Sequence, residues 1–523
     1  VGETGSGNSL TALSASQLLP STAVSQGELI WKGEDNLADA SDKQLRTLRA
    51  RHIGMIFQEP LSSLNPLMQC GEQVAETLRI HFDKSAKLAE QETKQWFVKV
   101  GLREPDRIYQ SFPHQLSGGQ RQRVMIAMAL CTWPVLLNAV VPSTALVVTV
   151  QNEILVLIKG LQKELGIAIL FISHDLGVIR EVTDEVLVMW KGEVVERGEV
   201  AKVLDAPQHP YTRGLVACRP GISGGRHRFP TVPDFLDLSE DEVEHFLASL
   251  GHKEPENKGV NSSPIALSAQ QLYVRYPKRK NWLGQVKEYH QAVQDVSFEL
   301  RNGECLGVVG ESGSGKTTLG KSLIQLVALQ SGSIYFGDVP LHELSEREFR
   351  PLRPKIQMIF QDPFSSLNPK LRIRDLLIEP LNLHASELSK QEREERVLEV
   401  LRQVELDPEV LERYPKAFSG GQRQRIGIAR ALLFRPSVLI CDESVSALDV
   451  SVQAQVLNLL KDLQETYSFS MLFISHDLGV IRFIADRVLV MQQGELVEEA
   501  TVDEIFQNPQ QAYTQQLLSA ILS

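Results

Sequence analysis

Short apolar runs bounded by turn residues recur along the chain and alternate with longer stretches of helical periodicity. Two clear runs are 438–441 (Val-Leu-Ile-Cys) and 470–474 (Ser-Met-Leu-Phe-Ile). Runs this short, with apolar residues on both faces, are typical of strands buried in a parallel sheet that helices cover on both sides. The pattern therefore predicts an α/β fold, in which ligand sites lie beyond the carboxyl ends of the strands.

The same pattern occurs twice. FISHDLGVIR begins at Phe171 and again at Phe473, and SGGQRQR begins at Ser117 and again at Ser419, 302 residues apart in both cases. A period of this length is far too long for a solenoid repeat and indicates two whole domains. We predict an N-terminal domain over 1–218, a linker over 219–263 and a C-terminal domain over 264–523.

The predicted linker is rich in Gly, Pro and charged residues and contains one predicted short helix. Ser239 is its expected N-cap, Glu242 closes a capping box and Gly251 ends the helix. Val243 and Phe246 lie on its apolar face, which we expect to dock on one of the domains.

Composition narrows the class of protein. With 523 residues, 43% of them hydrophobic and 23% charged, the chain has the make-up of a folded protein with two large domains. A net charge of -11 gives no reason to expect a nucleic-acid partner. The five cysteines stand singly, which suggests neither a zinc site nor a disulfide framework and fits a reducing cytoplasm. The first residues show no basic segment followed by an apolar run, so no secretory signal is indicated.

One stretch, 135–158, is apolar enough to raise the question of a membrane span. Its centre contains Asn138, Pro142 and Glu153, which is too polar for a helix that crosses lipid. We expect no span there, so any membrane role must come through partners.

The second copy contains a complete phosphate-binding loop. Residues 310–318 read Gly-Glu-Ser-Gly-Ser-Gly-Lys-Thr-Thr, directly after an apolar strand and before a helical stretch. Glycines let backbone N–H groups curl around phosphate at a helix N-terminus, the lysine reaches the β and γ oxygens, and the first threonine offers a hydroxyl to magnesium. The candidate ATP-binding residues of the loop are Gly310, Ser312, Gly313, Gly315, Lys316, Thr317 and Thr318.

Two adjacent carboxylates end a later strand of the same copy. Asp442 is placed to hold magnesium, and Glu443 to polarise the attacking water, because phosphoryl transfer needs positioning and charge neutralisation. A pair of acids at a strand end is also compatible with a solvated turn, but the phosphate-binding loop upstream favours the catalytic interpretation.

The sequence Phe-Ser-Gly-Gly-Gln at 418–422 resembles the signature of the ABC ATPase family. The resemblance implies two tandem P-loop NTPase domains, each with a mainly parallel sheet core, an antiparallel subdomain and a helical subdomain. It also implies that Gln361 contacts magnesium and the membrane partner, that Asp449 belongs to the D-loop and that His476 contacts the γ-phosphate. Tyr276 is similar to the aromatic residue that stacks on adenine, although a tyrosine in the core of a hairpin would look the same. Ser444 stands where many family members have proline, a departure that we do not expect to stop hydrolysis.

The first copy has lost most of this chemistry. Asn8 replaces the loop lysine, and since one charge pair at 4 Å is worth about 4 kcal/mol at an effective dielectric constant of ~20, phosphate should bind poorly. Val140 and Val141 replace the two carboxylates, and Val147 replaces the D-loop aspartate. The residues that the resemblance assigns to this degenerate site are Gly2, Gly7, Asn8, Ser9, Gln58, Val140, Val141, Val147 and His174, with Ser419, Gly420 and Gly421 from the second copy.

The signature of the first copy is intact, at Ser117, Gly118, Gly119 and Gln120. In the family, two domains pair head to tail, so that each ATP lies between one P-loop and the signature of the other domain. The resemblance therefore implies one consensus-like composite site, formed by the second P-loop and the first signature within an intramolecular domain pair.

The two copies also differ at their starts. The first begins at its Gly-rich loop, whereas 46 residues, 264–309, precede Gly310 in the second. This start fits a truncated sequence, a decaying gene or a real variant. In the last case alone, we expect the first sheet to have an uncovered edge, which would lower its stability or favour aggregation.

The segment QHPYTRGLVACRP at 208–220 and the weaker NPQQAYTQQLLSAI at 508–521 resemble the tails of the oligopeptide and dipeptide importer ATPases. The resemblance implies an ATPase with the cofactors ATP and Mg²⁺, peripheral on the cytoplasmic face of the inner membrane. Its implied partners are integral membrane permease subunits and, through them, a solute-binding protein. Peptides are the expected solutes, with glutathione, nickel or a peptide-like antibiotic as alternatives.

Two other interpretations remain at this point. A soluble tandem ABC protein acting on ribosomes or DNA would be expected to show a long charged helical linker, a metal module or a basic surface, and none is found in the sequence. A partly decayed transporter ATPase with little activity would suit the first copy alone.

Overall fold

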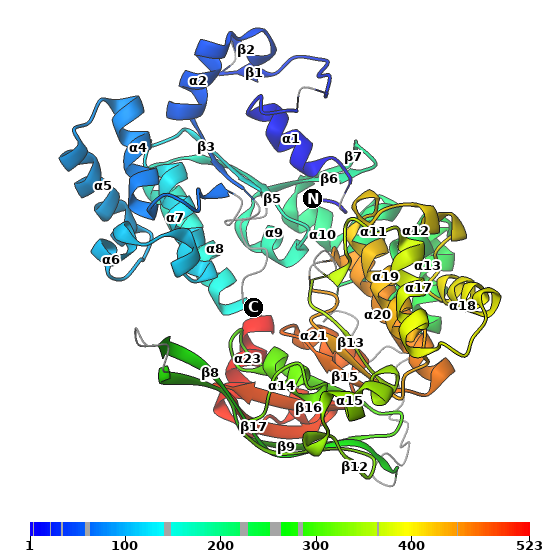
Figure 1. Cartoon of the computed structure of the whole chain (residues 1–523). Helices are drawn as coiled ribbons and strands as arrows, with labels where there is room; N and C mark the ends of the chain where they lie inside the picture. The colour runs from blue at the N-terminus through cyan, green and yellow to red at the C-terminus, as the bar shows by residue number, and fades with distance from the viewer. Residues whose placement is uncertain are drawn as a thin grey trace. The chain divides into compact units, whose positions relative to one another are not determined.

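The computed structural model describes residues 1–3, 5–20, 22–32, 35–57, 63–140, 148–219, 228–250, 263–280, 286–362, 366–446 and 448–522. The chain divides into two compact units, Val1–Val216 and Ala217–Ser523. The second unit therefore includes the region that we predicted as a linker. Figure 1 colours both units by position in the sequence.

The second unit is built on a six-stranded sheet in the order β13-β14-β15-β10-β16-β17. These strands are β10 (Cys305–Val309), β13 (Ile356–Ile359), β14 (Val438–Asp442), β15 (Ser470–Ile474), β16 (Arg487–Gln492) and β17 (Glu495–Thr501). All neighbouring strands are parallel except β16 and β17. Every residue of β10, β14 and β15 is buried, which confirms the parallel core that the apolar runs predict.

The register of this sheet brings several loops to one edge. Val308 of β10 lies opposite Ile474 of β15, and Ile474 lies opposite Asp442 of β14. The residues that follow these three strands, from Gly310, Glu443 and Ser475 onward, therefore leave the sheet side by side.

A four-stranded antiparallel sheet, in the order β12-β11-β8-β9, packs on the same unit through a shared hydrophobic core. Its strands are β8 (Ile265–Lys280), β9 (Val286–Arg301), β11 (Ser331–Phe336) and β12 (Val339–Pro340). In Figure 1, β8, β9 and β12 lie at one end of the unit, and the helical subdomain of α17, α18 and α19 gathers at the other. The predicted three-part architecture is thus present in this copy.

The helices of the second unit are α12 (Val232–Leu236), α13 (Glu240–Ser249), α14 (Lys316–Leu323), α15 (Glu346–Phe349), α17 (Ile373–His384), α18 (Lys390–Gln403), α19 (Gly420–Leu432), α20 (Val450–Tyr467), α21 (Leu478–Ile484), α22 (Val502–Gln507) and α23 (Ala512–Leu522). Short 3₁₀ helices span Leu341–Glu343, Arg350–Lys355, Pro408–Glu412 and Pro415–Ala417.

The segment before β8 packs on the second unit. Both backbone groups of Phe229 bond the side chain of Asn458 on α20, with the N–H donating to Oδ1 at 2.9 Å and the carbonyl accepting from Nδ2 at 2.9 Å. The Phe229 ring is buried, with its centroid 3.9 Å from that of Phe483. The predicted linker is thus partly an anchored segment.

The predicted linker contains two helices, where the sequence predicts one. The predicted helix is present as α13, with the expected capping box between Ser239 and Glu242, and Gly251 lies outside the described residues. The short α12 was missed because its own capping box, formed by Thr231 and Asp234, closes only one turn and a half.

The first unit repeats this plan in part. Its parallel strands are β3 (Ile53–Ile56), β4 (Leu136–Val140) and β5 (Ala168–Ile172), and its antiparallel pairs are β1 (Ile30–Trp31) with β2 (Asp35–Asn36) and β6 (Glu185–Trp190) with β7 (Glu193–Glu199). Its helices are α1 (Asn8–Ala15), α2 (Asp42–Arg51), α4 (Cys70–Phe82), α5 (Ala86–Lys99), α6 (Pro105–Gln110), α7 (Gly118–Leu130), α8 (Val148–Leu165), α9 (Leu176–Val182), α10 (Val200–Asp205) and α11 (Pro210–Ala217), with 3₁₀ turns at Leu37–Asp39 and Pro113–Gln115.

The two sheets differ at one position. In the second unit β10 pairs with both β15 and β16, whereas among the described residues of the first unit no strand lies between β5 and β6. A pocket of about 360 Å³ lies there, lined by residues of β5 and β6 together with Val1 and Asn8. Among the described residues, β5 pairs only with β4.

Within the described part of the chain, no helix combines the length and the apolar character that crossing a membrane requires.

Candidate active site

The phosphate-binding loop of the second unit connects β10 to α14 in a path that requires glycine. A Cβ on Gly310 would lie 2.1 Å from the Met491 carbonyl oxygen, and one on Gly315 would lie 2.2 Å from the Ala292 carbonyl oxygen. Gly313 and Gly315 have φ angles of 85° and 101°, which side chains rarely adopt. The loop thus packs tightly against the neighbouring backbone and leads directly into the N-terminus of α14.

Lys316 is the first residue of α14 and is only 4% exposed. Its Nζ donates to the carbonyl oxygens of Gly310 at 2.6 Å and Glu311 at 2.8 Å. Burial lowers the pKa of this ammonium group, and the negative charges of Glu443, Asp442 and Glu311 oppose that shift. The lysine is therefore held under the loop, within reach of a phosphate that the loop encloses.

Thr317 and Asp442 form the pair that the sequence predicts for magnesium. The Thr317 hydroxyl donates to Asp442 Oδ1 at 2.9 Å, although the two residues are 125 positions apart in the chain. Asp442 is 1% exposed, and this burial raises the pKa of its carboxyl, against the opposing effect of the Thr317 hydrogen bond. A hydroxyl beside a buried carboxylate fits Mg²⁺, a cation that takes oxygen ligands and neutralises phosphate charge when bound.

Glu443 lies where the side chains of Gln361 and His476 converge. Gln361 Nε2 donates to Glu443 Oε2 at 2.7 Å, and His476 Nδ1 is 3.5 Å from Oε1. The Glu443 backbone has a φ angle of 44°, an unusual conformation for a residue with a side chain. This turn directs the carboxylate toward both partners.

The charges of this group are linked. Burial acts to raise the pKa of Glu443, but the hydrogen bond and charge of His476 and the charge of Lys316 outweigh it, so that the pKa is lowered. Burial likewise acts to lower the pKa of His476, and Glu443 outweighs it, so that this pKa is raised. Glu443 is therefore ionised at neutral pH, as a group that polarises water must be.

Two further predicted residues lie at the margins of this site. The Tyr276 hydroxyl, on β8, is 3.5 Å from the Thr318 hydroxyl on α14, and the side chain is 38% exposed. This position beside the loop leaves the ring accessible to a nucleotide base. Asp449 is 9% exposed and is the N-cap residue of α20.

Both signature sequences begin a helix in the same way. Ser117 caps α7 and Ser419 caps α19, each through a capping box with the glutamine three residues later, Gln120 or Gln422. Since free backbone N–H groups at a helix N-terminus favour anions, either signature could bind phosphate oxygens. Gly118 and Gly119 form the first turn of α7, as Gly420 and Gly421 do in α19.

The first copy keeps the shape of the loop without its charge. A Cβ on Gly2 would lie 2.1 Å from the Met189 carbonyl oxygen, and Gly7 has a φ angle of 95°. Asn8 Nδ2 donates to the Gly2 carbonyl at 2.9 Å, while its buried Oδ1 has no hydrogen-bond partner among the described residues. Val140 ends β4 and is 6% exposed. These two positions therefore provide neither the cation nor the carboxylate that the second copy offers to Mg-ATP.

The remaining residues predicted for the first site are only partly described. Ser9 lies on α1, and His174 follows β5 and is partly exposed. Gln58, Val141 and Val147 lie outside the described residues.

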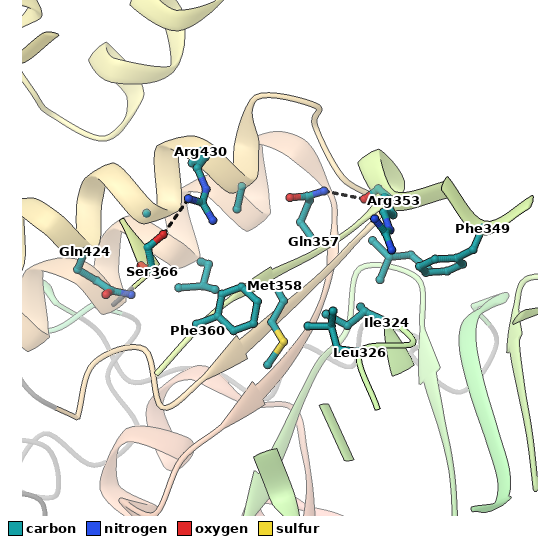
Figure 2. Close-up of a pocket in the computed structure, with 14 residues that line it drawn as sticks. Ile324, Leu326, Phe349, Arg353, Gln357, Met358, Phe360, Ser366, Gln424 and Arg430 are labelled. Atoms are coloured by element: carbon teal, nitrogen blue, oxygen red, sulfur yellow. Dashed lines mark hydrogen bonds between the residues drawn. The ribbon is translucent and has the colours of Figure 1, made fainter. Parts of the chain in front are cut away.

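The structure adds a pocket that the sequence did not reveal. It measures about 350 Å³ and lies between the parallel sheet and the helical subdomain of the second unit. Figure 2 shows Met358 and Phe360, around the end of β13, opposite Gln424 and Arg430 on α19, with Arg430 donating to the Ser366 carbonyl at 2.9 Å. Phe360 directly precedes Gln361, so the pocket adjoins the active site through that residue.

Comparison with known proteins yields consistent matches. A family model described as "ABC transporter" matches residues 1–139 and 293–446. A second model, "Oligopeptide/dipeptide transporter, C-terminal region", matches residues 195–240 and 497–523.

The chain is also similar to full-length proteins. It is 44% identical to the "Glutathione import ATP-binding protein GsiA" of Pectobacterium atrosepticum, an alignment that covers 100% of this chain and 84% of that protein. It is 45% identical to the "Uncharacterized ABC transporter ATP-binding protein YejF" of Escherichia coli, over 99% of this chain and 92% of that protein. Among solved structures, a bacterial ABC transporter cassette, MJ0796, is 28% identical, with a TM-score of 0.41 over 45% of this chain and 98% of that one.

The difference between the two copies leads to a prediction about nucleotide stoichiometry. A Glu443→Gln protein with excess Mg-ATP is expected to bind about one nucleotide per chain rather than about two, because Asn8 and Val140 provide no charge for phosphate or magnesium. Equilibrium dialysis with labelled ATP measures this ratio. Adding Lys316→Ala to that protein should abolish the binding, whereas adding Asn8→Ala should leave it unchanged. Two equivalents bound to the Glu443→Gln protein would contradict the prediction.

Proposed function

The chain belongs to the ABC transporter family of ATP-binding proteins, and from that premise we propose that its second copy hydrolyses ATP to power a membrane importer of peptides or peptide-like solutes. The observation that carries the proposal is the convergence of Gln361 and His476 on Glu443, whose charge also interacts with that of Lys316, beside the Thr317–Asp442 pair. These residues come from four separate segments, and their arrangement suits in-line attack of water on a phosphoryl group.

Each residue has a defined task in this proposal. The loop N–H groups and Lys316 bind the phosphates, and Thr317 and Asp442 hold magnesium. Glu443 accepts a hydrogen bond from the attacking water and polarises it. Gln361 and His476 position Glu443, and His476 reaches the γ-phosphate as it does in the family. Tyr276 stacks on adenine, and Asp449 belongs to the D-loop.

We further propose that the first copy contributes its signature to this site. Family members pair their domains head to tail, so the loop at Lys316 would work with Ser117, Gly118, Gly119 and Gln120. The intact capping box of Ser117 supports this role, because the helix N-terminus it begins is still shaped for an anion. The first copy would then be needed even though its own loop has lost its charge.

The expected solute follows from the tail regions. Residues 195–240 and 497–523 both match the oligopeptide and dipeptide transporter model, and one group of relatives is named for glutathione import. Glutathione is itself a peptide-like molecule, so small peptides are the solute class that we propose. Selection among them would depend on permease and solute-binding subunits.

We propose that the pocket in Figure 2 receives a cytoplasmic segment of the permease, which would place the protein on the cytoplasmic face of the inner membrane. The pocket is lined by apolar side chains, including Ile324, Leu326 and Phe360, with Arg353 and Arg430 among its polar groups. Its position next to Gln361 offers a direct path from an inserted segment to the residue that orients Glu443.

Filling this pocket tests the docking proposal. Gly427 lines the pocket, and a Cβ there would meet no atom within 4 Å. Gly427→Arg is therefore expected to fold normally, to keep the Mg-ATPase activity of the isolated protein and to lose permease in affinity purification from membranes. Gly160→Arg is the matched control, since Gly160 is also a helical glycine with open space around its Cβ.

The same purification separates the classes of function. Recovery of integral membrane permeases with the wild-type and Gly160→Arg proteins, but not with Gly427→Arg, supports the importer. Recovery of ribosomes in place of permeases would contradict the importer, and equal permease recovery with Gly427→Arg would contradict docking at this pocket.

A further inference from the structure

The hydroxyl of Tyr513 touches the phosphate-binding loop from outside the residues discussed so far. It accepts a hydrogen bond of 3.1 Å from the backbone N–H of Glu311, the second residue of the loop. Tyr513 lies at the start of α23, 202 positions further along the chain. Figure 1 shows α23 next to α14, the helix that directly follows the glycines of the loop.

The first copy repeats this contact. The hydroxyl of Tyr211 accepts a 3.0 Å hydrogen bond from the N–H of Glu3, the second residue of the degenerate loop. Tyr211 is fully buried and lies on the Trp190 ring, with 5.5 Å between centroids and 24° between planes. The two loops differ elsewhere in sequence, yet both make this contact. The contact is therefore a structural feature that the two copies share.

The segment that carries the tyrosine is itself fastened to the sheet. Glu498 on β17 accepts the backbone N–H groups of Gln510 at 2.8 Å and Gln511 at 3.2 Å, and it also accepts the hydroxyl of Thr514. In the first copy Glu196 on β7 accepts the N–H groups of Gln208 at 2.9 Å and His209 at 3.1 Å. Charge-assisted bonds of this kind hold the turn before the helix in one position.

The contact lies at a sensitive point of the loop. The Glu311 N–H donates to Tyr513, and the Glu311 carbonyl accepts from Lys316 Nζ at 2.8 Å. Because Tyr513 holds the N–H of Glu311, it also restrains the carbonyl of the same residue, which positions the Lys316 ammonium group. A series of contacts thus connects Glu498 at the sheet edge, through the segment that carries Tyr513, to the loop. Through these contacts the tail acts as a brace on the phosphate site.

We propose that Tyr513 is a positioning residue that holds the phosphate-binding loop ready for nucleotide, and that Glu498 anchors the segment that presents it. The proposal rests on the proposed role of the second copy as the nucleotide-binding copy. It assigns a task to the tail region, which otherwise marks only membership of the peptide-importer group.

The test removes a single hydroxyl. Tyr513→Phe in the full chain is expected to raise the KM for Mg-ATP by about three- to tenfold, the range for one lost neutral hydrogen bond, with kcat changed by less than about twofold. Tyr211→Phe is the matched control and should leave both constants unchanged. Glu498→Gln should shift KM in the same direction as Tyr513→Phe.

A binding measurement keeps this test independent of hydrolysis. In the Glu443→Gln background, the affinity for a fluorescent ATP analogue should fall about three- to tenfold with Tyr513→Phe and stay constant with Tyr211→Phe. If the wild-type protein hydrolyses no ATP while this pattern of affinities holds, the proposed ATPase function fails and the brace stands. Unchanged affinity and KM in Tyr513→Phe, or an equal loss with Tyr211→Phe, would overturn the brace.

Discussion

Replacing Glu443 by glutamine is expected to reduce the kcat for ATP hydrolysis by about 10²- to 10⁴-fold, the usual contribution of a positioned base. Glutamine has nearly the same shape, so the contacts to Gln361 and the packing at the end of β14 should persist. What disappears is the negative charge that His476 and Lys316 hold in the ionised state. Affinity for Mg-ATP should therefore remain close to that of the wild type.

The measurement compares steady-state phosphate release with nucleotide affinity for the same purified protein. Glu387→Gln, a change at an exposed glutamate of the helical subdomain, is the control for the effect of losing one carboxylate. Turnover within about tenfold of the wild type for Glu443→Gln would show that another group polarises the water.

Part of the proposed site is predictable from the sequence alone, because Lys316, Thr317 and the loop glycines lie within one short segment. Asp442 and Glu443 are also predictable, because acids at the end of a buried parallel strand must emerge at the same edge of the sheet as the loop.

Two other residues of the proposed site could not be identified from local sequence patterns. Gln361 and His476 are single polar residues, and only the family resemblance indicated that they matter. In the structure the side chains of both lie at the carboxylate of Glu443. Their distance from Glu443 depends on how β13 and β15 flank β14, which no local sequence pattern records.

Two features were missed altogether for the same physical reason. The hydrogen bond between Tyr513 and Glu311 and the anchoring of Phe229 by Asn458 join residues more than 200 positions apart, each through a side chain that bonds backbone groups. A tyrosine in a helix and an asparagine in a helix have many ordinary uses, so neither carries a local signal. Composition predicted a linker around Phe229, but burial of this one aromatic ring against Phe483 outweighs the polar character of the segment.

Replacing Ser117 by arginine is expected to lower ATP hydrolysis by about 10²-fold or more, whereas the same change at Ser419 should leave it within about twofold of the wild type. Both serines cap a signature helix through the same pair of hydrogen bonds with the glutamine three residues later. Each substitution removes an equivalent cap, which costs about 1 kcal/mol, and introduces the same large side chain. Any difference in activity between the two proteins therefore reports which signature serves the intact loop.

The direction of this difference separates three arrangements of the site. Loss with Ser117→Arg alone supports pairing of the Lys316 loop with the signature of the degenerate copy. Loss with Ser419→Arg alone would mean that the intact loop works with a second-copy signature, as it would if two chains paired through their second copies. Full activity in both proteins would contradict a role for either signature. Because Asn8 leaves the first loop without its cation, the signature of that copy is the remaining feature by which it could contribute to hydrolysis, and this pair of variants measures whether it does.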